Sequence, residues 1–596
     1  MRVCDYIADF IYKEGVNHVF MVSGGGMMFL SDGLVCHPKL KTVCCHHEQA
    51  AAMAAVSYAK YTRNLGVAYV TTGCGGTNAV TGVLNAWQDN VPCLFISGQA
   101  GYKETIRHSG LALRQVGVQE ADIIRIIGSI TKYSDIIIHP HEIKYHLQKA
   151  VYLAKTGRPA PVWLDVPLNV QCADVNEDEM MEFVPDVAWL DFAQAPSKLA
   201  LGYICQALSK ATRPIIIAGQ GIRIADAIED FKLFIEKTNI PYVVSRLGID
   251  LLPSNHPLFI GRIGTKGDRA GNFAVQNADL VLSIGSRLSI SSTGFNYSTF
   301  AREAQIIVVD IDDKEHKKDT IRIDRFLHCD AKRFLNEIDI GSISGDYKEW
   351  VNKCNGWKDK WKVCLDEYRV DGEGVNTYAF VYILSNNLKY DSVVVSDAGS
   401  AFYVTSQAIM LRDKQRYITS GGQAEMGYTL PATVGVCFSR DKKEVIGITG
   451  DGSFQMNVQE LQTIVHHKLP IKLFVWNNNG YSSIRETQDK FFEGRHIGTD
   501  NKSGVSFPDT EKIANAYGIQ YFRINTYSDI DGVIKKILSL DEPVICEVIC
   551  QKNQKVQPVV ASKKTEDGFV KALPLEDMYP FLDRDEFNKE MIIKPI

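Results

Sequence analysis

Short apolar, β-branched runs alternate with helix-like segments along almost the whole chain, and this alternation constrains the fold more than any other feature. The expected strands lie at 67–72, 93–97, 162–166, 214–219, 242–245, 279–285, 305–312, 392–397, 445–451, 471–478 and 544–549. Between them, segments such as 49–61 and 458–467 have the spacing of helices. Alternating elements with apolar strands predict parallel sheets covered by helices on both faces. We therefore expect an α/β protein.

The length of 596 residues suits three or four domains of about 100–200 residues each. Polar or proline-bearing stretches near 173–196 and 341–374 separate three units. We expect doubly wound parallel-sheet domains at 1–175, 190–345 and 365–550. A tail at 551–596 has little periodicity, and we expect it to pack as an arm over another surface.

Composition excludes several classes of protein. The net charge of −5 gives no basic footprint for nucleic acid. No apolar run approaches the roughly 20 residues of a membrane span, and the N-terminus lacks a signal-peptide core. The 14 cysteines form no CxxC pair, which predicts reduced thiols in a cytoplasmic protein rather than a zinc site. Cys44 and Cys45 are expected to point to opposite faces of a strand.

A split motif in the last third of the chain predicts a metal site. Gly450-Asp451-Gly452 follows one expected strand, and Asn477-Asn478-Asn479-Gly480 follows the next, with room for one helix between them. Such strand ends meet at one edge of a parallel sheet. A carboxylate, an amide oxygen and glycine backbone would converge there, which suits magnesium holding a diphosphate. Either half alone is more often an ordinary turn.

The first unit carries two further candidate segments. Glu48 stands at the mouth of a helix of small residues, where a carboxylate can simply be a favourable N-terminal charge. A glycine-rich turn, 71–78, follows an expected strand and opens a helix expected at 79–87. The free N–H groups of such a turn suit a polar ligand. Neither segment is specific by itself.

Together these segments resemble the thiamine diphosphate (ThDP)-dependent family of acetolactate synthase, pyruvate oxidase and 2-oxo acid decarboxylases. The family reads Arg-His-Glu-Gln around its activating glutamate, a position that Glu48 fills. Its Thr-Ser-Gly-Pro-Gly-x-Thr-Asn turn corresponds to 72–78, with Cys74 in place of the proline. Further matches lie at 157–162, 256–258, 420–422 and 426–428. The resemblance spans about residues 1–550.

The resemblance implies a pyrimidine-binding, a central and a diphosphate-binding domain, with ThDP and Mg²⁺ as cofactors. Glu48 would hydrogen-bond the aminopyrimidine ring and shift it to the imino form, which takes the thiazolium C2 proton. Met426 would prop the bent cofactor. The implied catalytic residues are Glu48, Gly25 and Gln119. The implied metal ligands are Asp451, Asn478 and the Gly480 carbonyl. The implied cofactor-binding residues are Glu48, Gly73, Asn78, Ser400, Gln423, Met426, Gly450, Asp451, Gly452, Ser453, Asn478, Gly480 and Tyr481.

The implied reaction is decarboxylation of a 2-oxo acid, most simply pyruvate, with transfer of the remaining fragment to a carbonyl acceptor. Simple decarboxylation, hydrolysis of a cyclic dione and a non-catalytic cofactor-binding paralogue stay open as alternatives. The family builds its site between subunits, so the resemblance implies a homodimer at least and commonly a homotetramer.

Three departures from acetolactate synthase point to another acceptor. A polar insertion follows residue 99, the stretch 480–487 has no Trp, and the tail is long. The chain here is closer to members encoded with surface-polysaccharide biosynthesis, some of which act on a nucleotide-linked keto-sugar. Arg107, His108, Arg114 and Arg485 are candidates for an anionic or polyhydroxyl substrate, or else solvated charges.

The middle unit resembles the family's FAD-binding domain at 285–287 and 310–312. The family's Arg-Phe-Asp-Asp-Arg is Arg287-Leu288-Ser289-Ile290-Ser291 here, so the acidic pair and second arginine are missing. Binding of FAD therefore stays an open alternative, and the missing acidic pair and second arginine argue against it.

Overall fold

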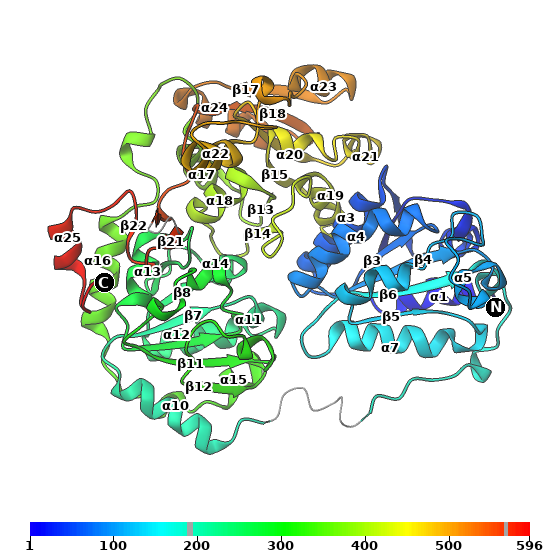
Figure 1. Ribbon diagram of the computed structural model, residues 1–596, viewed down its shortest axis with the longest axis horizontal. Coiled ribbons are helices and arrows are strands. Elements are labelled where there is room, and N and C mark those ends of the chain that lie inside the picture. Colours follow the sequence, from blue (N-terminus) through cyan, green and yellow to red (C-terminus); the bar gives the residue numbers. More distant parts are fainter. Residues whose placement is uncertain (187–194, 565–569) are drawn as a thin grey trace.

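The computed structural model describes residues 1–186, 195–564 and 570–596. It contains three six-stranded sheets, and every pairing within them is parallel. Helices cover both faces of each sheet, and the three domains surround a common junction (Figure 1). This confirms the predicted α/β fold of three doubly wound domains. The predicted second boundary, residue 190, lies outside the described residues, and the other boundaries stay predictions.

The first domain has the strand order β2-β1-β3-β4-β6-β5. Its strands are β1 (His18–Met21), β2 (Lys41–Cys44), β3 (Gly66–Val70), β4 (Cys93–Gln99), β5 (Tyr133–Ile136) and β6 (Val162–Pro167). Its helices are α1 (Val3–Lys13), α2 (Met28–Cys36), α3 (Glu48–Thr62), α4 (Cys74–Gln88), α5 (Ile106–Ser109), α6 (Ile123–Ile127), α7 (Ile143–Lys155) and α8 (Leu168–Gln171). α4 begins five residues earlier than the helix predicted at 79–87, so the glycines of the predicted turn form its first turn.

The central domain has the order β12-β11-β10-β7-β8-β9. Its strands are β7 (Pro214–Ala218), β8 (Tyr242–Val244), β9 (Phe259–Arg262), β10 (Leu280–Ile284), β11 (Gln305–Asp310) and β12 (Arg325–His328). Its helices are α10 (Lys198–Lys210), α11 (Gly221–Ile224), α12 (Ile228–Thr238), α13 (Arg269–Gln276), α14 (Ile290–Thr293), α15 (Ala331–Glu337) and α16 (Lys348–Lys360).

The third domain has the order β14-β13-β15-β16-β18-β17. Its strands are β13 (Val393–Ser396), β14 (Arg416–Thr419), β15 (Val445–Gly450), β16 (Ile471–Asn477), β17 (Gln520–Ile524) and β18 (Val544–Ile549). Its helices are α17 (Thr377–Asn387), α18 (Gly399–Ala408), α19 (Thr429–Ser439), α20 (Asp451–Gln455), α21 (Glu460–His466), α22 (Ser482–Phe492), α23 (Thr510–Ala516) and α24 (Tyr527–Leu538).

Small residues allow the first and third domains to pack closely. α3 lies against both α4 and α19 (Figure 1), and the alanines at 50–52, 54 and 55 are fully buried there. A Cβ on Gly82 of α4 would lie 2.5 Å from the Ala52 Cβ, and one on Gly435 of α19 would lie 2.1 Å from the Ala54 carbonyl oxygen. One hydrophobic core therefore runs through both domains.

The tail packs against the central domain of its own chain (red in Figure 1). It contains β19 (Val559–Val560), β20 (Ser562–Lys564), β21 (Val570–Ala572), β22 (Met578–Tyr579) and α25 (Arg584–Glu590). Glu576 is fully buried and pairs with Arg302 at 2.7 Å, while Phe587 joins the core around Phe273. The described parts of the tail therefore pack on the central domain.

The cysteines and the helices bear on the expected thiol chemistry and on the expected lack of a membrane span. All 14 cysteines are free thiols, with Cys44 exposed and Cys45 buried. Across the described ranges, none of the helices has the length and apolar character needed to cross a membrane.

Candidate active site

The two halves of the split motif meet at the carboxyl edge of the third sheet. β15 and β16 are neighbours, paired from Val445 with Ile471 to Gly450 with Trp476. β15 ends at Gly450, and α20 begins at Asp451. The Gly452 N–H donates to Asp451 Oδ1 at 2.8 Å, and the Gly480 N–H donates to Oδ2 at 3.0 Å. The carboxylate therefore fixes the second half of the motif directly.

The polar atoms at this edge fit a divalent cation. Asn478 Oδ1 is buried and accepts no hydrogen bond from the described residues, although Asn478 Nδ2 donates to Ser482 Oγ at 3.1 Å. Burial raises the pKa of Asp451 to about 6. A buried acceptor without a donor and a carboxylate withdrawn from water are both unfavourable alone. A hard cation such as Mg²⁺ would satisfy both.

Arg485 holds the loop that carries Asn478. Its guanidinium donates to the carbonyl oxygens of Asn478 at 2.8 Å and Asn479 at 2.7 Å. Gly480 has a φ of +127°, and a Cβ there would lie 2.0 Å from the Thr499 carbonyl oxygen, so only glycine fits. Arg485 was a candidate for substrate contact, but the structure directs its donors to this loop.

Asp397, at the end of β13, is a site residue that the sequence reasoning missed. Its carboxylate accepts hydrogen bonds from the Ser453 hydroxyl and, at 3.0 Å, from the Thr449 hydroxyl. Burial raises the pKa of Asp397. Ser453 Oγ in turn accepts from the Gly427 N–H at 2.7 Å. Ser453, predicted to bind the cofactor, thus donates its hydroxyl proton to Asp397. The sequence signal that could have identified Asp397 is its position as an acidic residue at the end of a predicted strand.

A loop at 420–428 carries two more predicted cofactor contacts. Gln423 Oε1 is buried and lacks a hydrogen-bond partner among the described residues, and Met426 is half-buried. The loop is fixed from the first domain, because Asp89 accepts from the N–H groups of Gly421 at 2.9 Å and Gly422 at 2.7 Å. Of the remaining predicted contacts, Gly450 and Ser400 are half-buried, and the Tyr481 ring meets the Phe507 ring edge to face beside Gly452.

Glu48 is buried in the first turn of α3. Asn78 of α4 donates through Nδ2 to Glu48 Oε2 at 3.0 Å. Glu48 Oε1 makes no hydrogen bond with the described residues and lies 3.4 Å from where a Cβ on Gly75 would stand. One carboxylate oxygen is thus anchored, and the other is left for a ligand.

The other predicted first-domain residues gather around the same turn. A Cβ on Gly73 would lie 1.9 Å from the Gln119 carbonyl oxygen, so Gln119 lies directly beside it. Gln119 is exposed, and its backbone φ of +59° is uncommon for a residue other than glycine. The Gly26 N–H donates to Thr71 Oγ1 at 3.2 Å, which brings the Gly25 loop to this turn as well.

The polar insertion forms an exposed segment of the first domain. Arg107 pairs with Asp122 at 3.1 Å, and the His108 ring lies 5.1 Å from the Tyr102 ring. Arg114 is fully exposed. These contacts bring none of the three residues to Glu48, so their role in substrate binding stays a prediction.

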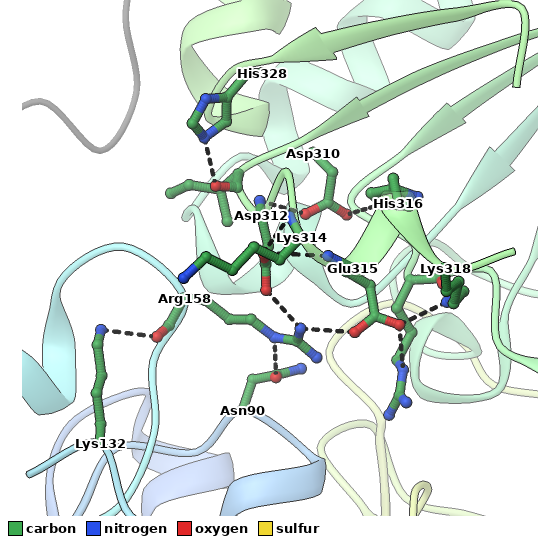
Figure 2. Close-up of polar contacts among 12 residues, drawn as sticks. Asn90, Lys132, Arg158, Asp310, Asp312, Lys314, Glu315, His316, Lys318 and His328 are labelled. Carbon is green, nitrogen blue, oxygen red and sulfur yellow. Dashed lines mark hydrogen bonds and ion pairs between the residues drawn. The ribbon is translucent and has the colours of Figure 1, made fainter.

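Among the central-domain residues expected near FAD, Asp312 is tied to the first domain instead. Figure 2 shows Arg158 donating to Asp312 Oδ2 at 2.7 Å and to Glu315 Oε2 at 2.8 Å. Asp310 lies 3.3 Å from His316 in an ion pair. In dinucleotide sites, a carboxylate at a strand end accepts from the ribose hydroxyls. The carboxylates here are already engaged, so they do not fit that role.

The two halves of the predicted site come from separate places in this chain. His46 and Gln49, which flank Glu48, bond to Glu460 and Asn457 of the third domain at 3.0 and 3.1 Å. No hydrogen bond or ion pair among the described residues joins Glu48 to Asp451 or Asn478.

Comparisons with known proteins agree with this domain arrangement. Three family models match: the thiamine pyrophosphate enzyme N-terminal TPP binding domain at 1–124, the central domain at 201–338 and the C-terminal TPP binding domain at 397–548.

Curated relatives match over nearly the full length. The acetolactate synthase large subunit of Lactococcus lactis is 30% identical over 93% of this chain and 94% of the relative. That of Corynebacterium glutamicum is 32% identical over 96% and 90%. The isozyme 2 large subunit of Escherichia coli is 30% identical over 94% and 97%. The chain therefore belongs to the ThDP-dependent enzymes of the acetolactate synthase type.

Proposed function

We propose that this protein uses ThDP and Mg²⁺ to decarboxylate a 2-oxo acid and to transfer the remaining fragment to a carbonyl acceptor. The observation that carries the proposal is that Asp451, which accepts from the Gly480 N–H, and Asn478 Oδ1, which has no donor among the described residues, lie at the ends of two neighbouring strands. Membership of a family whose relatives are named acetolactate synthase supports ligation. Pyruvate is the simplest donor.

In this proposal, bound ThDP supplies a stabilised carbanion at its thiazolium C2. Asp451, Asn478 and the Gly480 carbonyl hold Mg²⁺, and Gln423 offers a buried acceptor toward the same cofactor. Glu48 shares a proton through Oε1 with a ring nitrogen, while Asn78 holds Oε2 and fixes the carboxylate. Gly25 and Gln119 line the approach to the reacting centre.

The identity of the acceptor distinguishes the competing reactions. A nucleotide-linked keto-sugar is proposed because the chain departs from acetolactate synthase after the metal-binding loop, at 480–487. Incubating pyruvate with and without 2-oxo acids, aldehydes and nucleotide keto-sugars, followed by mass spectrometry, identifies the product. An aldehyde formed regardless of acceptor would instead indicate a simple decarboxylase, and absence of CO₂ release from every 2-oxo acid would contradict the proposal.

The proposed assembly is a homodimer at least, with Glu48 of one subunit facing the Asp451 edge of another, and we propose a homotetramer as the full assembly. The lack of a hydrogen bond or ion pair between Glu48 and Asp451 among the described residues of one chain supports this arrangement. We also propose a cytoplasmic location, since free thiols such as exposed Cys44 suit a reducing compartment.

Removal of the metal is expected to abolish turnover. Protein treated with EDTA should release no CO₂ from pyruvate, and Mg²⁺ added with ThDP should restore the rate. Asp451→Ala should stay inactive after the same addition, because it lacks the carboxylate that accepts from the Gly480 N–H. Lys13→Ala, which breaks an exposed ion pair at 2.8 Å, is the control that should recover fully.

The purified protein is expected to lack bound flavin. Arg158 engages Asp312 and Glu315, two carboxylates that follow the end of β11. An absorbance scan of the purified protein should therefore show no flavin band in the visible region, before or after incubation with FAD and desalting. A retained yellow chromophore would contradict this expectation.

A further inference from the structure

Two cations of the central domain meet the aromatic face of a third-domain helix. Arg246 begins the short helix Arg246–Gly248 after β8, and Lys266 lies in the loop between β9 and α13. The Arg246 Cζ is 4.4 Å from the Phe402 ring centroid and 5.3 Å from that of Tyr403. Lys266 Nζ lies 3.3 Å from the Tyr403 centroid. Both rings belong to α18.

Neither cation has an anionic partner among the described residues. Arg246 Nη1 is buried without a hydrogen bond, and no ion pair within 4.0 Å is formed by Arg246 or Lys266 there. Other cations around the junction are paired, such as Lys60 with Asp89 at 2.7 Å and Arg223 with Asp250 at 2.9 Å. Two half-buried cations that share one ring without a counter-charge are costly.

The electrostatics around Lys266 show the same imbalance. Burial, together with the positive charge of Arg246, lowers the pKa of Lys266 to about 8. Glu486 of α22 opposes this effect from a distance without forming an ion pair. An anion placed between the two cations would offset both the desolvation and the mutual repulsion.

The pair lies next to the proposed reaction site. α18 begins at Gly399 and Ser400, and a Cβ on Gly399 would lie 3.7 Å from Ser483 Oγ of α22. Leu247 packs against Gly421, since a Cβ there would lie 2.5 Å from its side chain. Arg246 also lines a cavity of about 530 Å³ where the three domains meet. A ligand could thus reach the cofactor loop while its larger part lies in this cavity.

We propose that Arg246 and Lys266 bind the negatively charged group of the acceptor, either a carboxylate or a phosphate ester. The planar guanidinium suits two-point recognition of either group, and the lysine adds a point charge beside it. The inference rests on the proposed ligation reaction for its functional meaning. The anion site itself is defined by the two unpaired cations.

Acceptor kinetics test the site. R246Q and K266Q should each raise the KM for a charged acceptor about tenfold or more, the effect expected for losing a charged hydrogen bond. Two acceptors, 2-oxobutyrate and a nucleotide-linked keto-sugar, distinguish a carboxylate from a phosphate source. With neutral propanal as acceptor, the KM should change less than twofold, which a general disturbance of the fold would not produce.

Lys358 provides the matched control. It is also a half-buried central-domain cation, with Nζ 5.2 Å from the Phe259 ring centroid, but it donates to the Phe259 carbonyl oxygen at 2.6 Å. K358Q should leave the KM of charged acceptors unchanged. Equal KM values for wild type, R246Q and K266Q with both charged acceptors would overturn the inference.

A binding measurement keeps the inference testable apart from turnover. Amine labelling of the cofactor-loaded protein with acetic anhydride, read by mass spectrometry, should show Lys266 protected by 2-oxobutyrate or by uridine diphosphate. Lys358 should not be protected, and R246Q should remove the protection of Lys266. Lys266 labelled equally with and without both anions would overturn the anion site. Protection without any ligation product would instead refute the proposed function and leave the site standing.

Discussion

Glu48→Gln is expected to lower the turnover of 2-oxo acids by about 10²–10⁴-fold, the range for loss of a positioned acid or base. Glutamine has the same shape and can still accept from Asn78, whose Nδ2 lies 3.0 Å from Glu48 Oε2. It cannot share a proton through the other atom. ThDP binding, measured by calorimetric titration with Mg²⁺ present, should change little, because the proposed contacts with the metal and the diphosphate lie at Asp451 and Asn478.

Glu460→Gln is the matched control for that variant. Glu460 is also buried, and it accepts from the His46 N–H at 3.0 Å, two residues before Glu48. Its amide can keep that bond, so turnover should stay within a few-fold of wild type. Activity surviving in Glu48→Gln would show that the carboxylate assignment is wrong. Equal losses of turnover in both variants would indicate that the N-terminal end of α3 is disturbed, rather than that proton transfer is lost.

The neighbouring strand ends that carry the proposed metal site could be predicted from the sequence because their signals are local. The strands expected at 445–451 and 471–478 are β15 and β16, buried from end to end except at their last residue. Continuous apolar runs of this kind are typical of central parallel strands. The neighbourhood of Asp451 and Gly480 then follows from topology, since adjacent parallel strands end at one edge.

Edge strands and long-range polar contacts could not be predicted in this way. β17 and β12 have mostly exposed or half-buried residues, so no apolar run marks them. The partners of Arg485 are backbone carbonyls, and the acidic partners of Arg158 lie more than 150 residues away in the sequence. A side chain of this kind looks the same in a sequence whether it binds a substrate or fixes a loop.

The ion pair between Lys60 and Asp89 is expected to be the strongest polar contribution to the junction of the first and third domains. The pair is almost fully buried at 2.7 Å, and Lys60 also donates to Asn85 Oδ1 and the Thr419 carbonyl oxygen. Burial alone would lower the pKa of Lys60, but Asp89 raises it above its ordinary value. Both groups are therefore charged, and each depends on the other.

Asp89→Leu should destabilise the protein by about 3–5 kcal/mol, since it leaves a buried ammonium without its counter-charge. It also removes the acceptor of the Gly421 and Gly422 N–H groups, so ThDP affinity should fall. Lys60→Met should cost less, because those two donors still satisfy Asp89. The double variant should be less unstable than the sum of the two singles.

Thermal unfolding with and without ThDP and Mg²⁺ measures these effects. For Asp89→Leu, the midpoint should fall by roughly 10 °C, and saturating cofactor should raise it less than in wild type. Lys13→Met, which removes an exposed pair with Asp9 at 2.8 Å, should shift the midpoint by only about 1–3 °C. Equal midpoint shifts for Asp89→Leu and Lys13→Met would show that the buried pair contributes no more than a surface one. An unchanged ThDP affinity in Asp89→Leu would show that the 420–428 loop is fixed by other contacts.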